Sequence, residues 1–160
     1  MVHGENSALV GIRAGLTVAP VPVMALITDT PYSNVTFQII GCALRVHSAV
    51  GPGMLEEPYK LALAAEMLDA RLRFETEVRL PFRYKSRVLG NAYLMDFVVE
   101  NLVVIEVRAV AQLLPVHRAQ LTSYLKLSGH PAGLLLNFNV ASMSEGIVRV
   151  LNDRPASKST

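Results

Sequence analysis

The sequence lacks several features that would place the protein in a special class. It has one cysteine, Cys42, so no internal disulfide can form, and we expect a reducing, cytoplasmic compartment. Charged residues make up only 18% of the chain, and the formal net charge of +2 does not by itself indicate a nucleic-acid partner. No apolar run reaches the roughly 20 residues that span a bilayer. Prolines interrupt the stretch 16–27, and no basic leader precedes it, so we expect neither a membrane anchor nor a secretory signal.

Hydrophobic residues, by contrast, are abundant. They form 51% of the 160 residues, which fits a single domain with its own core. Residues 1–33 show no sustained periodicity and are interrupted by six glycines and prolines. We therefore expect a flexible N-terminal extension over 1–33, a folded domain over 34–152 and a polar tail over 153–160.

Apolar residues at helical spacing predict two helices at the start of this domain. The first stripe is Ile39, Ala43, Val46 and Val50. Asn34 or Thr36 is expected to cap this helix, and Gly51-Pro52-Gly53 to end it. A second helix is expected from about Leu55. Its predicted buried stripe is Leu61, Ala65 and Leu68.

A period of two from Leu72 onwards predicts strands. We expect them over 72–80, 82–89, 93–99 and 102–107, with the last two joined as an antiparallel hairpin. A helix is predicted from Pro115 to about Leu127, then a strand covered on both faces over 133–138 and a short helix over 144–151. This order predicts an α/β fold, a three-layer α/β/α sandwich with a mixed central sheet of about five strands.

The predicted hairpin 93–107 carries an unusual set of charges. If it is centred on Asn101, Asp96 lies opposite Glu106, and Glu106 and Arg108 share a face. Opposed carboxylates repel unless a cation neutralises them, and Mg²⁺ accepts carboxylate, carbonyl and water oxygens. Alternatively, one carboxylate pairs with Arg108 and the other reaches solvent. The residue types leave both interpretations open.

Two motifs carry a resemblance to known families. Asp96 followed by Glu106-Val107-Arg108 resembles the Asp…Glu-x-Lys core of the PD-(D/E)XK nuclease superfamily. Upstream, the segment 53–59, GMLEEPY, matches the G-x-x-E-x-x-Y motif of the GxxExxY proteins. The similarity covers about residues 37–150 in order. Its flanking segments are 39–41, 46–47, 51–53, 115–117, 120–121, 123–125 and 136–139.

The resemblance implies a restriction-endonuclease-like core and a nuclease that uses Mg²⁺ or Mn²⁺ to hydrolyse phosphodiester bonds of DNA or RNA. The metal ligands that it implies are Glu56, Asp96, Glu106 and the carbonyl oxygen of Val107. Tyr59 follows Glu56 by one helical turn, on the same face. Gln120 and Tyr124 are four residues apart on the third helix and are expected to line the site.

Arg108 departs from the pattern, because the motif has Lys at this position. An arginine does not lose its proton at ordinary pH and prefers forked pairing with a carboxylate or phosphate. Arg108 can therefore stabilise charge on a phosphate, or it can clamp Glu106 and Asp96 in place of the metal. The second case predicts an inactive nuclease-fold protein that binds nucleic acid or a protein. Lys85 is a weak substitute for the motif lysine and Lys126 a poor one, since Lys126 lies on the other side of its helix from Tyr124.

A set of basic residues and two histidines, His47 and His117, each have two interpretations. A set of basic residues either contacts phosphates or forms a solvated face; it consists of Arg71, Arg73, Arg79, Arg83, Lys85 and Arg87. His47 and His117 are each either a metal ligand or a structural residue, and the absence of a second ligand at zinc-site spacing favours the structural role.

Overall fold

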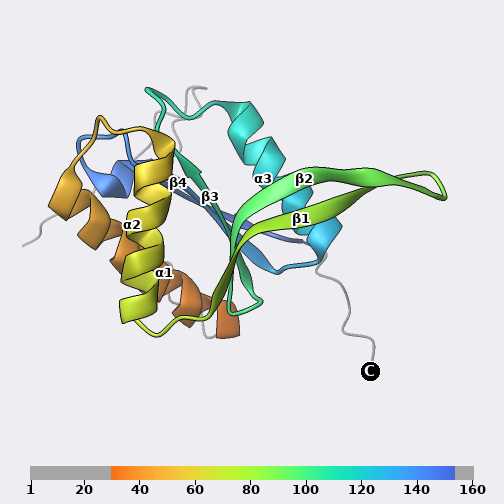
Figure 1. Ribbon diagram of the computed structural model, residues 1–160, viewed down its shortest axis with the longest axis horizontal. Coiled ribbons are helices and arrows are strands. Elements are labelled where there is room, and N and C mark those ends of the chain that lie inside the picture. Colours follow the sequence, from red (N-terminus) through yellow and green to blue (C-terminus); the bar gives the residue numbers. More distant parts are fainter. Residues whose placement is uncertain (1–29, 154–160) are drawn as a thin grey trace, which may run out of the picture.

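The computed structural model describes residues 30–153, so the predicted extension and tail lie almost entirely outside the described residues. Three α-helices, five strands and one 3₁₀ helix follow one another along this part of the chain (Figure 1). They are α1 (Pro31–Val50), α2 (Glu56–Asp69), β1 (Phe74–Tyr84), β2 (Arg87–Val99), β3 (Val103–Arg108), α3 (Pro115–Ser128), β4 (Ala132–Asn137), η2 (Met143–Gly146) and β5 (Ile147–Leu151).

The five strands form one mixed sheet in the order β1-β2-β3-β4-β5. Only β3 and β4 run parallel, connected through α3, and the other neighbours are antiparallel. Helices α1 and α2 pack on one face and α3 on the other, each over its own cluster of buried side chains (Figure 1). All six residues of β4 are buried, as its continuous apolar run predicts. The predicted α/β sandwich with five strands is confirmed.

Helix α1 starts earlier than its apolar stripe indicates. Thr30 is the N-cap residue and Pro31 occupies the first turn. A proline is tolerated there because the backbone N–H groups of the first turn have no acceptor within the helix. The expected caps are wrong, since Asn34 and Thr36 lie inside the helix and the Thr36 hydroxyl donates to the Tyr32 carbonyl (2.6 Å). The predicted end at Gly51 is confirmed, and this residue has a φ of +66°. Cys42 is buried in the core, as expected.

Helix α2 buries a different face from the predicted one. Leu61 and Leu68 are each 65% exposed, whereas Tyr59, Leu63 and Met67 are completely buried. Alanines and leucines of α2 lie on several faces of the helix, so periodicity alone does not show which face is buried. The aromatic ring of Tyr59 decides it, because it stacks on Phe138 with the ring centroids 4.7 Å apart.

Three strands precede α3, where the sequence analysis predicted four. β1 continues through Pro81 and β2 through Gly90, with the turn between them at Lys85 and Ser86. Proline is acceptable in β1 because this is an edge strand, although the pairing shifts register on both sides of Pro81. The predicted last helix is also wrong. Its second half is the strand β5, whose β-branched residues pair with β4 and complete the sheet.

The β1–β2 hairpin changes its packing partners halfway along. Phe97 packs in the α1/α2 core, but Met95, two residues away on β2, packs in the α3 core. The residue between them is Asp96. Opposite it on β1, Glu77 has a φ of +52° and makes no regular pair. Leu80 and Tyr93 still pack over α3, and beyond them the hairpin projects outward (Figure 1). Within residues 30–153, no helix is both long and apolar enough to cross a membrane.

Candidate metal and phosphate site

The site lies where β2 and β3 diverge. Their regular pairing ends at Phe97 and Ile105, in the register that the sequence predicts. At the next position, hydrogen bonds from backbone N–H groups to carboxylate side chains replace the regular backbone pairing. The backbone N–H of Asp96 donates to Glu106 Oε1 (3.1 Å), and the N–H of Val107 donates to Asp96 Oδ2 (2.8 Å). The two carboxylates therefore face the same side of the sheet, and each accepts a backbone hydrogen bond from the opposite strand.

Glu106 lies in a strongly perturbed environment. The residue is only 2% exposed. Burial, followed by the neighbouring Asp96 carboxylate, raises the pKa of Glu106 from 4.5 to about 7. The Asp96 N–H and the Arg108 guanidinium oppose this rise but do not cancel it. A buried carboxyl group with a raised pKa is typical of functional sites.

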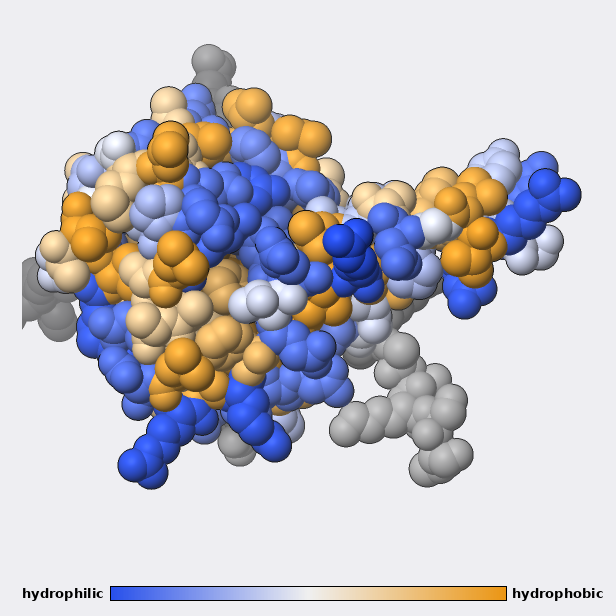
Figure 2. Space-filling view, in the orientation of Figure 1, coloured by the Kyte–Doolittle hydropathy of each residue, from blue (hydrophilic) through white to orange (hydrophobic). Residues whose placement is uncertain are grey.

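Arg108 reaches all four predicted metal ligands with one nitrogen atom. Its Nη1 donates to the Val107 carbonyl oxygen (2.7 Å) and lies 3.2 Å from Glu106 Oε2. The same atom is 3.8 Å from Asp96 Oδ2 and 3.9 Å from Glu56 Oε1. The four oxygens that the sequence analysis grouped together thus surround one point, and a cationic nitrogen occupies it. Figure 2 shows hydrophilic residues gathered between α2 and the base of the hairpin.

Gln120 and Tyr124 of α3 hold the other side of the guanidinium. Arg108 Nη2 donates to Gln120 Oε1 (2.8 Å), and Gln120 Nε2 donates to the Tyr124 hydroxyl (2.9 Å). The pKa of Tyr124 is raised, first by burial and then by the negative charge of Glu106. The predicted pair therefore does lie at the site, and its direct contact is with Arg108.

Lys60 is a site residue that the sequence analysis missed. Its Nζ lies 3.0 Å from Asp96 Oδ1 and 3.6 Å from Glu56 Oε1. Burial lowers the pKa of Lys60, but the Asp96 and Glu56 carboxylates more than offset this and raise it, so the ammonium stays charged. A signal was present in the sequence, since Glu56 and Lys60 are four residues apart and residues at that spacing share a helix face.

Tyr59 has a different role from the one expected. It does not share the face of Glu56 but points into the core, where its hydroxyl donates to the Gly51 carbonyl (2.6 Å) and accepts from the Met54 N–H (3.2 Å). The tyrosine thus fixes, through these two hydrogen bonds, the loop that leads into α2. In the G-x-x-E-x-x-Y segment, the glutamate faces the site and the tyrosine positions the helix that carries it.

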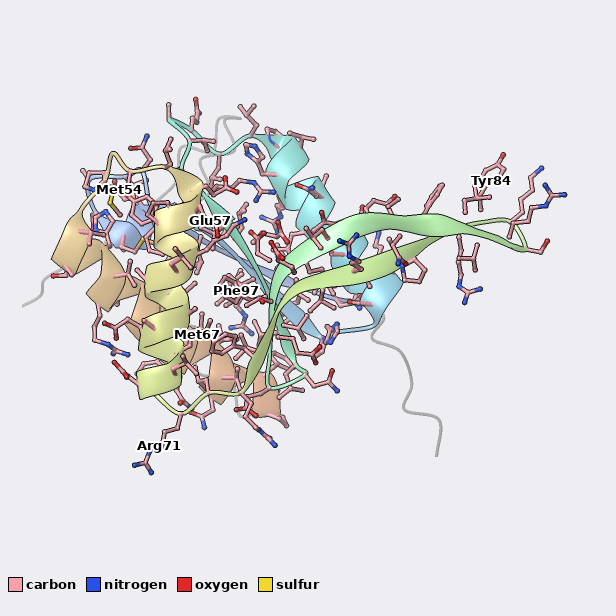
Figure 3. All side chains as sticks on the ribbon, in the orientation of Figure 1. Met54, Glu57, Met67, Arg71, Tyr84 and Phe97 are labelled. Carbon is pink, nitrogen blue, oxygen red and sulfur yellow. The ribbon has the colours of Figure 1, made fainter. Side chains whose placement is uncertain are left out.

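The other candidates lie elsewhere. His117 Nδ1 accepts the Leu114 N–H (2.9 Å) at the start of α3, and His47 Nε2 bonds to the Val140 carbonyl (2.8 Å), so both have structural contacts. Lys85 stacks over the ring of Tyr84 at the hairpin tip, far from the site (Figure 3). Lys126 is exposed in the last turn of α3.

The oxygen donors are of the kind that a hard divalent cation binds, but they are fewer than the ligands that such an ion needs. In the described part of the chain, no three His, Cys, Asp or Glu side chains form a group that could hold a metal ion. Asp96, Glu106 and the Val107 carbonyl remain as a set of two carboxylates and one carbonyl. Mg²⁺ accepts such a set because it keeps several waters as ligands. The position between these donors is the one that Arg108 Nη1 holds.

One of the three comparisons with known proteins gives a family match. Residues 33–150 match the family model described as PD-(D/E)XK nuclease superfamily. The search of curated proteins and the search of solved structures each give no significant match. The narrower resemblance to the GxxExxY proteins stays a prediction. The matched region covers most of the chain and contains α1 to β5 almost completely, together with every residue of the site. The chain therefore belongs to the PD-(D/E)XK nuclease superfamily.

Proposed function

We propose that this protein is a nuclease that uses Mg²⁺ or Mn²⁺ to hydrolyse phosphodiester bonds of nucleic acid in the cytoplasm. The observation that carries the proposal is the convergence of four oxygen donors within 3.9 Å of one cationic nitrogen. Clustered carboxylates at the divergence of two strands need a cation, and a buried carboxyl group with a raised pKa is typical of a functional site. The buried, free Cys42 fits a reducing compartment.

Asp96, Glu106 and the Val107 carbonyl would hold the metal, with Glu56 at the edge of the set. Such an ion supplies an activated water and neutralises negative charge on the scissile phosphate. Arg108 cannot share the position between these oxygens with a divalent cation, since both are positive and the space is the same. Its long side chain ends in a fork that fits a phosphate as well as a carboxylate.

Lys60 gives the site an ammonium group in addition to the guanidinium of Arg108. It approaches the acidic pair from α2, and it contacts the Asp96 oxygen that accepts no backbone hydrogen bond. A compact, charged ammonium there stabilises an anionic oxygen in the way that the motif lysine would from β3. We infer that Lys60 takes the place of the lysine that the motif lacks.

The arrangement of Arg108 also favours a second candidate function. Two cations, Lys60 and Arg108, already neutralise much of the charge on Glu56, Asp96 and Glu106. A site that is balanced in this way does not need a metal. The alternative is a catalytically inactive module that binds nucleic acid, or a protein, with the same surface.

Calorimetric titration with Mn²⁺, together with cleavage of labelled DNA and RNA, distinguishes the two functions. For the nuclease, we expect Mn²⁺ binding that Asp96→Asn abolishes, and cleavage that EDTA stops. Arg108→Lys should bind Mn²⁺ at least as tightly as the wild type does. A wild-type protein that binds no Mn²⁺ and cuts neither substrate would leave only the inactive module. Asp69→Asn, at the exposed end of α2, is a control that leaves the site unchanged.

A further inference from the structure

The β1–β2 hairpin carries a charge pattern that the site does not explain. Between Val78 and Met95 the sequence contains four basic residues, and no aspartate or glutamate. These residues are Arg79, Arg83, Lys85 and Arg87. All four are exposed. Some basic residues elsewhere are paired with acidic ones, as Arg73 is with Glu100 and Arg45 with Glu66.

The hairpin begins at the site. Arg79 pairs across the ribbon with Leu94, and Leu94 is two residues from Asp96 on β2. Arg79 therefore lies about two residues along the ribbon from the acidic pair. Of the four basic residues, Arg79 is the one nearest the site along the hairpin.

The outer half of the hairpin has basic residues on both faces. Arg83 pairs with Val88, and Tyr84 pairs with Arg87. Consecutive pairs in a two-stranded ribbon face opposite sides, so Arg83 and Arg87 point in opposite directions, and Lys85 lies in the turn. Figure 2 shows this part projecting freely from the body, with hydrophilic and apolar residues mixed along it.

We propose that the β1–β2 hairpin is a double-stranded-DNA-binding arm that lies in the major groove beside the proposed nuclease site. A two-stranded ribbon fits the major groove of B-form DNA, which is about 12 Å wide. Arg83 and Arg87 then face the phosphates on the two sides of the groove. A-form RNA has a deep, narrow major groove that does not admit such a ribbon.

Charge argues for this occupant over a second copy of the chain. The segment 79–94 carries four positive charges and no negative ones, so two copies of it repel one another. The exposed apolar residues Tyr84, Val88 and Leu89 provide contact with bases and sugars, or with the methyl groups of thymine. The arm rests on the proposed function in one respect only, namely that nucleic acid is the substrate.

The length of the hairpin sets the length of the DNA. About ten residues separate Asp96 from the turn, which corresponds to about 30 Å of strand. At about 3.4 Å for each base pair, the tip contacts the duplex about nine base pairs from the scissile phosphate. Duplexes shorter than about 10 base pairs should therefore lose the contribution of the hairpin.

Fluorescence anisotropy in EDTA tests the arm without cleavage. The probes are a 20-base-pair DNA duplex, an RNA duplex of the same sequence and single-stranded DNA, each over a range of NaCl concentrations. The hairpin variant is Arg83→Gln/Arg87→Gln. The matched control, Arg45→Gln/Arg71→Gln, removes the same charge from the side of α1 and α2; the labelled Tyr84 and Arg71 lie at opposite ends of the view (Figure 3).

We expect the hairpin variant to bind duplex DNA roughly 10- to 100-fold more weakly at 0.1 M salt, with a salt slope reduced by about two. The control variant should bind like the wild type, and the wild type should prefer DNA duplex to both other probes. Equal loss in both variants, equal binding of RNA duplex, or no DNA binding would each overturn the proposal. So would a hairpin variant that changes only the sedimentation of the protein, since this would indicate self-association.

The outcome is independent of the proposed chemistry. If the hairpin variant loses DNA binding but the wild type binds no Mn²⁺, the arm stands and the nuclease proposal fails. If Mn²⁺ binds at Asp96 but the hairpin variant binds DNA like the wild type, the nuclease proposal stands and the arm fails.

Discussion

At the scale of single residues, Arg108 is the centre of the site. It links three carboxylates, one backbone carbonyl and Gln120, and its side chain is 15% exposed. A guanidinium in this position stabilises the fold while it competes with any metal for the same oxygens. Stability and metal binding are therefore coupled through this one side chain, which a metal titration of a variant can measure.

Replacing Arg108 with methionine should reveal this coupling. In EDTA, we expect the variant to lose about 1–3 kcal/mol of unfolding free energy, because the buried Glu106 loses its cationic partner. Mg²⁺ should then stabilise the variant more than it stabilises the wild type, since a ligand that binds only the folded state raises its stability. Urea denaturation with and without Mg²⁺ measures both effects. An equal Mg²⁺ effect on both proteins would contradict the shared position. Arg118→Met, on the exposed surface of α3, is the control.

Lys60 provides a second test at this scale, and it rests on the proposed nuclease activity. Lys60→Ala should lower kcat by roughly 100-fold or more with little change in KM, as expected for a lost electrostatic contact in the transition state. Mn²⁺ affinity should not fall, because Asp96 loses a competing cation. Lys60→Arg should restore part of the rate. A loss of both rate and Mn²⁺ affinity would indicate a damaged site instead. Lys126→Ala serves as the control.

The sequence predicted the acidic residues of the site better than their counterions. Asp96 and Glu106 belong to one hairpin, and its register follows from a short turn at Glu100 and Asn101. The spacing places Lys60 on the face of Glu56, but the face that α2 turns to the site depends on how the helix docks. That orientation is fixed by the stacking of Tyr59 on Phe138, which local periodicity does not contain.

At the scale of elements, the same distinction explains which parts of the fold were predictable. The ends of α1 and α3 follow from Gly51 and Gly129, which have positive φ angles. The strand β4 follows from its unbroken apolar run. The strand β5 was mistaken for a helix because five residues are too few to show a period, and only its pairing with β4 makes it a strand.

Two glycines test the close packing of β4 and its neighbours. A Cβ at Gly146 would lie against the carbonyl oxygen of Asn137, whereas a Cβ at Gly133 would meet only side-chain atoms of Leu121, the nearest at 2.8 Å. Backbone cannot move aside as a leucine side chain can. We expect Gly133→Ala to cost about 1–3 kcal/mol and Gly146→Ala clearly more. Thermal and urea unfolding measure both, and the opposite order would contradict this account. Gly41→Ala, whose nearest contact is at 3.5 Å, is the control.

The turn between β2 and β3 should give a pH-dependent contribution. The Arg73 N–H donates to Glu100 Oε1 (2.8 Å) and its guanidinium donates to Oε2 (2.9 Å), and these hydrogen bonds lower the pKa of Glu100 below 4.5. The contribution is therefore present above pH 4.5 and is lost as the pH falls through the lower, folded-state pKa. Glu100→Gln should cost at most about 1 kcal/mol at pH 7. Urea denaturation at pH 7 and pH 3 should find a smaller difference at pH 3 than at pH 7.

At the scale of the whole molecule, we expect residues 30–153 to form an autonomous domain. The family match covers residues 33–150, and the five-stranded sheet and the helices that cover it lie within 30–153. A fragment with these ends should unfold cooperatively, with a Tm within about 2 °C of the full chain, because a single domain carries its own core. Calorimetry of both proteins checks this. A lower Tm for the fragment would assign part of the stability to residues outside it.

The divergence of β2 and β3 has a consequence for the order in which the site assembles. Asp96 and Glu106 are ten residues apart on one hairpin, so the acidic pair requires only local chain closure. Lys60 arrives from a preceding helix, and Gln120 from the helix that connects the parallel strands β3 and β4. Non-local contacts form late in folding. Arg108 belongs to the same hairpin as the two carboxylates, so one positive charge accompanies the acidic pair from the start. We expect Lys60 and Gln120 to join it only when the helices that carry them dock on the sheet.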